Sequence, residues 1–225
     1  MRTMNRQAGF TLVEIAIVLV IIGLLLGGIL KGQEMITQAR IKNVINDFNG
    51  ITAAYASYQD RYRAIPGDDA GAQARWGLGA PAVPSTPGNG TVDGTYNAPT
   101  AGVEPESRLF WWHLRQAGFI PGATAPANVA AAQPTNAVSG MIGVQNGTGA
   151  GTMGLSGLIV CSANIPDKIA IAVDTQTDDQ SALTGSLRAM QQAASNPAIA
   201  AGFPAAPYAA YQETGANQYL LCKGV

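Results

Sequence analysis

The stretch Gly9–Leu30 reads GFTLVEIAIVLVIIGLLLGGIL, and it decides how the rest of the chain can be organised. No charged or strongly polar side chain occurs from Ile15 to Leu30. The 21 residues from Phe10 to Leu30 would form about 31 Å of helix, which is enough to cross the apolar part of a bilayer. Glu14 is the one acid in this stretch. Because an ionisable side chain within a membrane span is costly, Glu14 is predicted to have a function.

The residues ahead of this stretch, MRTMNRQAG, carry Arg2, Arg6 and the terminal amine but no acid. This bias predicts a cytoplasmic N-terminus and export of the remaining chain. An ordinary secretory signal peptide fits less well. Its apolar segment is usually about 7–15 residues long and is followed by a small-x-small cleavage site, whereas the apolar segment of this chain is longer and no such site follows it. A plain signal anchor stays open as an alternative, but it leaves Glu14 and the Gly9-Phe10 junction unexplained.

Gly9-Phe10-Thr11-Leu12-Val13-Glu14, with a basic leader before it and the apolar segment after it, resembles the prepilin processing signal of bacterial type IV pilins and pseudopilins. The resemblance implies that a membrane prepilin peptidase cuts between Gly9 and Phe10 and methylates the new amine of Phe10. It also implies that Glu14, together with Thr11, forms the assembly contact with the amine of a neighbouring subunit.

The physical chemistry of Glu14 agrees with this implication. In hydrocarbon an ionised carboxylate needs a counter-charge, and the amine freed at Phe10 of another copy supplies one. Before cleavage the leader occupies that position, so processing is expected to act as a switch for polymerisation. In the unassembled monomer, Glu14 near the cytoplasmic interface can instead reach water.

Beyond the membrane segment the chain predicts a continuing amphipathic helix. Apolar side chains recur mainly at three- and four-residue steps from Ile36 to Tyr62, with charged residues between them. Pro66 disfavours helix at the residue before it, so the helix is expected to end near Ala64. The tyrosines Tyr55, Tyr58 and Tyr62 are expected to pack against a sheet rather than to bind a ligand.

The expected fold class is α+β and pilin-like, a long N-terminal helix packed on a C-terminal antiparallel β-sheet head. The chain then divides into a cleaved leader (1–9), a transmembrane or filament-core segment (10–30), an amphipathic continuation (31–64) and a loop-rich head (65–225). A short helix is expected over Pro105–Ala117, and 165–173 fits either a helix or a strand. The expected strands are Met141–Val144, Leu155–Cys161, Leu183–Ala189 and Gln218–Lys223.

Cys161 and Cys222 are the only cysteines, and both lie on the exported side. An even, widely separated pair in an oxidising compartment predicts a structural disulfide, worth at most about 4 kcal/mol in the chain-entropy model. Pilins often carry a C-terminal disulfide, so the resemblance agrees.

Other motifs give weaker indications of chemistry. Residues 149–154 match the dinucleotide-binding glycine spacing, but strand-like residues follow where that motif needs a helix, so a hairpin loop is expected. His113 is the sole histidine, and it is interpreted as a surface residue on a short helix. At least one of Trp111 and Trp112 is expected to anchor that helix to the head. Asp174, Asp178 and Asp179 are a weak calcium candidate; turn formation and helix capping are the default roles of such aspartates.

Charge gives no case for a nucleic-acid partner. Removal of the leader lowers Lys+Arg from 13 to 11 against 14 acids, a formal charge of −3.

The expected function is therefore structural: a subunit of a type IV pilus-like filament, without enzymatic activity or a cofactor. Its expected partners are further copies of itself, prepilin peptidase, the pilus or type II secretion assembly machinery and the bacterial inner membrane. The precursor is expected to cross that membrane once, and the filament to lie at the cell surface or to span the periplasm. Two alternatives stay open, a type II secretion pseudopilin and a membrane-anchored binding module or enzyme.

Overall fold

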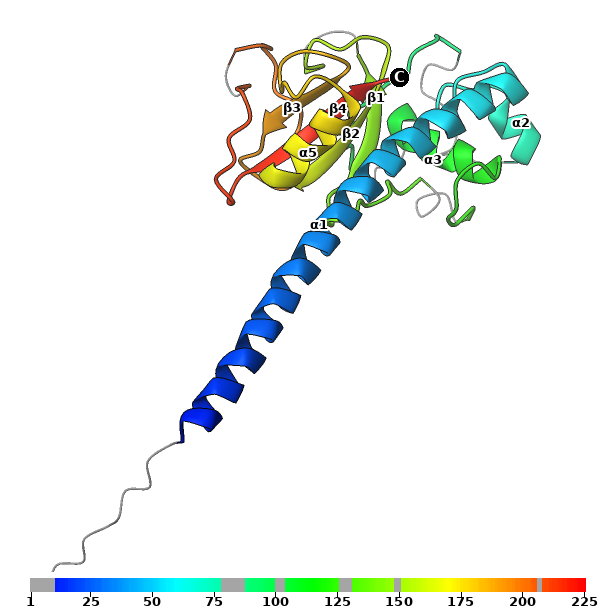
Figure 1. Ribbon diagram of the computed structural model, residues 1–225. Coiled ribbons are helices and arrows are strands. Elements are labelled where there is room, and N and C mark those ends of the chain that lie inside the picture. The colour runs from blue at the N-terminus through cyan, green and yellow to red at the C-terminus, as the bar shows by residue number, and fades with distance from the viewer. Residues whose placement is uncertain (1–10, 78–87, 100–103, 126–130, 148–150, 206–207) are drawn as a thin grey trace, which may run out of the picture. The chain divides into compact units, whose positions relative to one another are not determined.

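The computed structural model describes residues 11–77, 88–99, 104–125, 131–147, 151–205 and 208–225. Helix α1 (Leu12–Tyr62) opens the chain, and an antiparallel four-stranded sheet lies toward the C-terminus (Figure 1). The α+β, pilin-like fold expected from the sequence is thereby confirmed. By its contacts the chain divides into two compact units, Met1–Ala39 and Arg40–Val225, which are described separately below.

The sheet belongs to the second unit, and its strands follow the order β1-β2-β4-β3. All three pairings are antiparallel, and a register shift interrupts the β2–β4 pairing between Ser162 and Ile165. The long C-terminal strand therefore lies inside the sheet, between β2 and β3. The strands are β1 (Ile142–Asn146), β2 (Leu158–Pro166), β3 (Leu187–Gln191) and β4 (Gln218–Gly224).

Both faces of the sheet are covered, because successive side chains of a strand point to opposite faces. In β2, Leu158 and Val160 face one core, whereas Ile159 and Cys161 face a second core. The first core holds α1 together with α3 (Glu106–Gln116) and α5 (Asp167–Thr177). From α1 it receives Ile41, Val44, Phe48, Ile51, Ala54 and Tyr58, spaced by three or four residues as a helix face requires.

Loops and the disulfide complete the second core. Tyr96, Met153 and Tyr208 pack there against the sheet. Cys161 and Cys222 are directly opposite each other on the neighbouring strands β2 and β4, and a disulfide joins them. The predicted pairing of the two cysteines is confirmed, and it ties the C-terminal strand to the sheet.

Two helix expectations need refinement. The segment that fitted either a helix or a strand forms α5, because Pro166 and Asp167 begin a helix and the buried positions Ile169, Ala170 and Val173 have helical spacing. Helix α1 ends at Tyr62 rather than near Ala64, since Arg63 adopts a φ of +53°. A one-and-a-half-turn helix, α2 (Ala72–Trp76), follows in the next segment.

Two strands begin later than expected. β2 starts at Leu158 rather than Leu155 because Gly157, with a φ of +75°, forms a turn just before it. β3 starts at Leu187 rather than Leu183 because the preceding residues form a turn in which Gly185 also has a φ of +75°. In both places a single leucine followed by turn-forming residues precedes the segment that pairs in the sheet.

Candidate functional site

The candidate assembly site lies at the start of α1. Gly9 and Phe10, predicted for cleavage and methylation, lie outside the described residues, which begin at Thr11. The backbone N–H and the hydroxyl of Thr11 both donate to Oε2 of Glu14, each at 2.8 Å, and the Glu14 N–H lies 3.3 Å from the Thr11 hydroxyl oxygen. This reciprocal arrangement is a capping box, which satisfies backbone donors that a helix start otherwise leaves unpaired.

The Thr-x-x-Glu spacing of Thr11 and Glu14 is the sequence signal of a capping box. It gives Glu14 a second role besides the predicted contact between subunits. Its carboxylate is held at the first turn of its own helix, four residues after Phe10.

The first unit exposes a continuous apolar surface. The large hydrophobic side chains of α1 between Leu12 and Leu30 are all at least 46% exposed, and Met35 and Ile36 are exposed as well. Among the described residues, α1 is the one helix long and apolar enough to cross a membrane. A surface of this kind indicates a lipid or protein partner.

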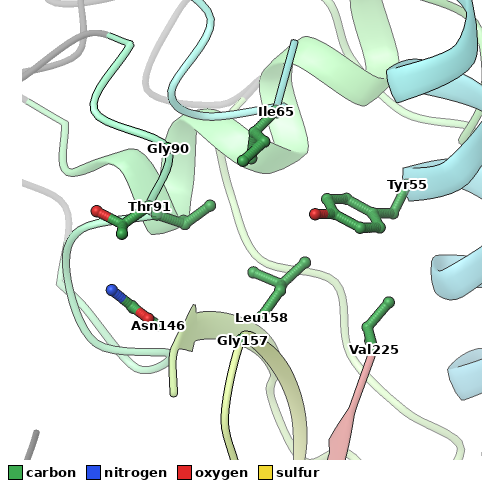
Figure 2. A pocket seen from close by; sticks show the side chains of 9 residues that line it. Tyr55, Ile65, Gly90, Thr91, Asn146, Gly157, Leu158 and Val225 are labelled. Atoms are coloured by element: carbon green, nitrogen blue, oxygen red, sulfur yellow. The ribbon is translucent and has the colours of Figure 1, made fainter. Parts of the chain in front are cut away.

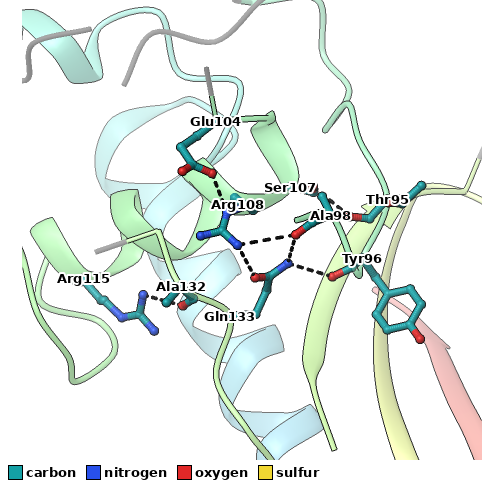
Figure 3. Close-up of polar contacts among 9 residues, drawn as sticks. All are labelled: Thr95, Tyr96, Ala98, Glu104, Ser107, Arg108, Arg115, Ala132 and Gln133. Carbon is teal, nitrogen blue, oxygen red and sulfur yellow. Dashed lines mark hydrogen bonds and ion pairs between the residues drawn. The ribbon is translucent and has the colours of Figure 1, made fainter. Parts of the chain in front are cut away.

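A buried ion pair fixes α3 in the head (Figure 3). Arg108 Nε donates to Glu104 at 2.5 Å, and Arg108 Nη1 donates to the side-chain oxygen of Gln133 at 2.8 Å. Gln133 in turn donates to the backbone carbonyls of Tyr96 and Ala98. This network links three loop segments to α3. Glu104 and Arg108 have the i, i+4 spacing of a helical ion pair, a signal present in the sequence, whereas Gln133 lies 25 residues from Arg108 and could not be predicted as a partner.

His113 lies in the interior of the head, so its interpretation as a surface residue was wrong. The ring has no exposed area, and its Nδ1 accepts the Gly67 N–H at 2.9 Å. Burial lowers the pKa of His113 to about 4, so the ring stays neutral at physiological pH. Trp111 and Trp112 are both buried, which confirms that α3 is anchored through its tryptophans.

A second polar cluster joins α1 to α2. The Tyr58 hydroxyl donates to Asp69 at 2.6 Å, and Arg75 pairs with the same carboxylate at 2.8 Å. The Arg75 guanidinium also lies 4.3 Å from the ring centre of Tyr62. These contacts give Tyr58 and Tyr62 a structural role, but the partners in them belong to α2 and the segment before it rather than to the sheet that the sequence predicted.

Asp174, Asp178 and Asp179, the weak calcium candidate, come together, with one oxygen of each within 4.8 Å of the others. Each carboxylate already accepts hydrogen bonds from this chain. Asp174 accepts the Gln180 N–H and the Tyr211 hydroxyl, and Asp178 accepts the Leu187 N–H. The two bonds of Asp179 come from the Ser181 N–H and the Thr184 hydroxyl. The cluster therefore shapes the turn between α5 and β3, which is the default role given to it from the sequence.

A pocket of about 270 Å³ opens between α1, the loop at Thr91 and the start of β2 (Figure 2). Tyr55, Ile65, Leu158 and Val225 supply mainly apolar walls. Tyr55 is the one lining side chain that titrates, and its hydroxyl accepts a hydrogen bond from Gln59. This lining brings together no acid, base and nucleophile of the kind that catalysis requires.

Comparison with known proteins gives one match. A family model described as the prokaryotic N-terminal methylation motif matches residues 4–30. This segment is therefore a type IV pilin-like prepilin signal, and it includes the predicted cleavage junction, the Thr11–Glu14 pair and the apolar half of α1. Neither the curated proteins nor the solved structures contain a chain that matches. Together with the pilin-like fold, this signal supports a prepilin of the type IV pilin or pseudopilin type, and it fits a membrane-anchored precursor.

Proposed function

We propose that this chain is a prepilin that is cut between Gly9 and Phe10, methylated at Phe10 and polymerised through α1 into a type IV pilus-like filament. In the filament, the Phe10 amine of one copy pairs with Glu14 of the next. Copies of this chain, prepilin peptidase, the assembly machinery and the inner membrane are its partners.

The observation that carries the proposal is the methylation motif at residues 4–30, within which one acid interrupts an exposed apolar helix. An acid in that setting requires a counter-charge, and the cleaved junction creates one four residues away in sequence. The energetics also suit the proposal. Transfer of the apolar half of α1 from lipid into a bundle of such helices exchanges one apolar environment for another, so the subunit can leave the membrane without a large loss of solvation energy.

Processing is tested by mass spectrometry of the intact protein purified from its host. We expect a chain that begins at Phe10, with one added methyl group on its amine. Functional material that retains the Met1 leader would contradict the proposal.

Assembly is tested with Glu14→Ala, which should insert into the membrane normally but enter fibres poorly because the amine loses its partner. Glu34→Ala is the matched control, since Glu34 is an exposed acid on the same helix that pairs with Lys31 at 2.7 Å within its own chain. Normal entry of the Glu14 variant into fibres would refute the pairing, whatever the control shows.

The cellular location of the fibres distinguishes a pilus from a secretion pseudopilus. We expect long fibres containing this chain in the fraction sheared from the cell surface. Fibres confined to the periplasm would replace this version with the type II secretion pseudopilin.

A further inference from the structure

Asp47 is a partly buried acid on the part of α1 that belongs to the head. Among the residues that the structure describes, none forms a hydrogen bond or an ion pair with its carboxylate. Burial raises the pKa of Asp47, because partial removal from water disfavours the charged form of its carboxylate. Partial burial of a carboxylate that has no partner is energetically unfavourable, and the binding of a cation can relieve this cost.

Asp47 lines an open pocket of about 310 Å³ between α1, α3 and the segment before β1. The pocket is open beside Gly50, where an added Cβ would meet nothing within 4 Å. Arg115 also lines it, but Nη1 of Arg115 donates to the carbonyl of Ala132 at 2.7 Å (Figure 3). The remaining wall is largely apolar. Besides the polar Asn46 and Thr135, it comprises Ile51, Trp111, Phe119, Ile120, Pro121, Pro134 and Ile142.

We propose that this pocket receives Lys42 of a second copy of the chain. Lys42 is an exposed cation on α1, and within the described residues it has no acidic partner of its own. Its methylene stem suits the apolar wall and its ammonium suits Asp47. This inference rests on the proposed function, in which copies that share one membrane orientation pack their α1 helices in parallel.

Sequence spacing supports the choice of Lys42. Phe10 precedes Glu14 by four residues, and Lys42 precedes Asp47 by five, which correspond to about 6 and 7.5 Å along a helix. A parallel copy displaced by about one turn therefore brings its amine level with Glu14 and its Lys42 within about 1.5 Å of the level of Asp47. Arg40 would miss that level by about 4.5 Å at the same displacement.

Within one copy Lys42 and Asp47 cannot satisfy each other. Residues five apart on a helix point about 140° away from one another, and their Cα atoms lie about 8.6 Å apart. That distance also exceeds the roughly 7 Å limit for a disulfide, so cysteines at these two positions can join only different copies.

The test is oxidation of fibres assembled from the full chain carrying K42C and D47C together. Because the native cysteines are already paired, the introduced thiols should link neighbouring copies into a ladder of covalent multimers on non-reducing gels. R40C with D47C is the matched control and should give a ladder at least about fivefold weaker, because its register is wrong. Fibres that form normally without a ladder would overturn the inference and leave the proposed function intact.

If the cysteine variant fails to assemble, the pairing can be tested by exchanging the charges of residues 42 and 47. K42D and D47K should each lower fibre yield about fivefold or more, and the combined K42D/D47K chain should recover most of the loss. Single variants that assemble like the wild type, or a double variant no better than the singles, would contradict the pairing. Absence of fibres from the wild-type chain itself would instead refute the proposed function.

Discussion

Asp174 is an acid with no exposed surface, and two further aspartates lie beside it. Burial, with some contribution from these neighbours, raises the pKa of Asp174 to about 6, against 3.8 for an ordinary aspartate. The unfolded chain therefore releases this proton at lower pH than the folded head does. The contribution of Asp174 to stability is present below about pH 4 and is lost as the pH rises to about 6.

We accordingly expect Asp174→Asn to stabilise the head relative to the wild type by an amount that grows between pH 4 and 6, to about 3 kcal/mol, and then levels off. The amide oxygen can still accept from Gln180 or Tyr211. Urea denaturation of the full chain in micelles, with a chelator present to keep cations from the cluster, measures the difference. Parallel pH curves for the two proteins would show that Asp174 titrates normally.

At the scale of single residues, the sequence predicted chemistry best where the partners are close in the chain or set by composition. Glu14 stands out because every neighbour from Ile15 to Leu30 is apolar or small, and the cysteines are the only two present. The buried position of His113 could not be predicted, since its partner Gly67 is 46 residues away. Short patterns do not specify which distant loop covers a helix.

At the scale of elements, α3 depends on an ion pair that water hardly reaches. Arg108 is 4% exposed and Glu104 has no exposed area. Arg108→Met should destabilise the head by about 3–5 kcal/mol, because it leaves a buried carboxylate without a counter-charge. Glu104→Met combined with Arg108→Met should recover much of that loss, since it removes the stranded charge.

Thermal or urea unfolding of the single and double variants measures this coupling. Equal stability of the wild type and Arg108→Met would mean that the pair contributes nothing. Losses that simply add in the double variant would mean that Arg108 acts through packing alone.

Elements were predicted well where a periodic pattern is long and poorly where it is short. The apolar steps from Ile36 to Tyr62 fix α1 almost to its last residue. In α5, by contrast, Ile169–Val173 alternates like a strand, and only packing against the sheet selects the helix, with Ile169, Ala170 and Val173 turned inward. The starts of β2 and β3 shifted because glycine turns, rather than hydrophobicity, set where pairing begins.

At the scale of the whole molecule, the two compact units have opposite solvent requirements. Met1–Ala39 includes the apolar half of α1, which is exposed, whereas Arg40–Val225 buries its own apolar side chains in two cores. Stability of the head therefore need not depend on the membrane segment. Assembly, in the proposed function, depends on both.

Loss of the disulfide is expected to affect the stability of the head but not the insertion of α1 into the membrane. The disulfide joins residues 61 apart in sequence, across the neighbouring strands β2 and β4. Its loss, in C161A/C222A or on reduction, should lower the free energy of unfolding by about 2–4 kcal/mol, because the unfolded chain regains the freedom of a long loop. Membrane insertion should be unchanged, since the apolar half of α1 lies outside that loop. Urea denaturation with and without reductant, alongside membrane fractionation, measures both; equal unfolding curves would mean that the sheet holds its C-terminal strand without the covalent link.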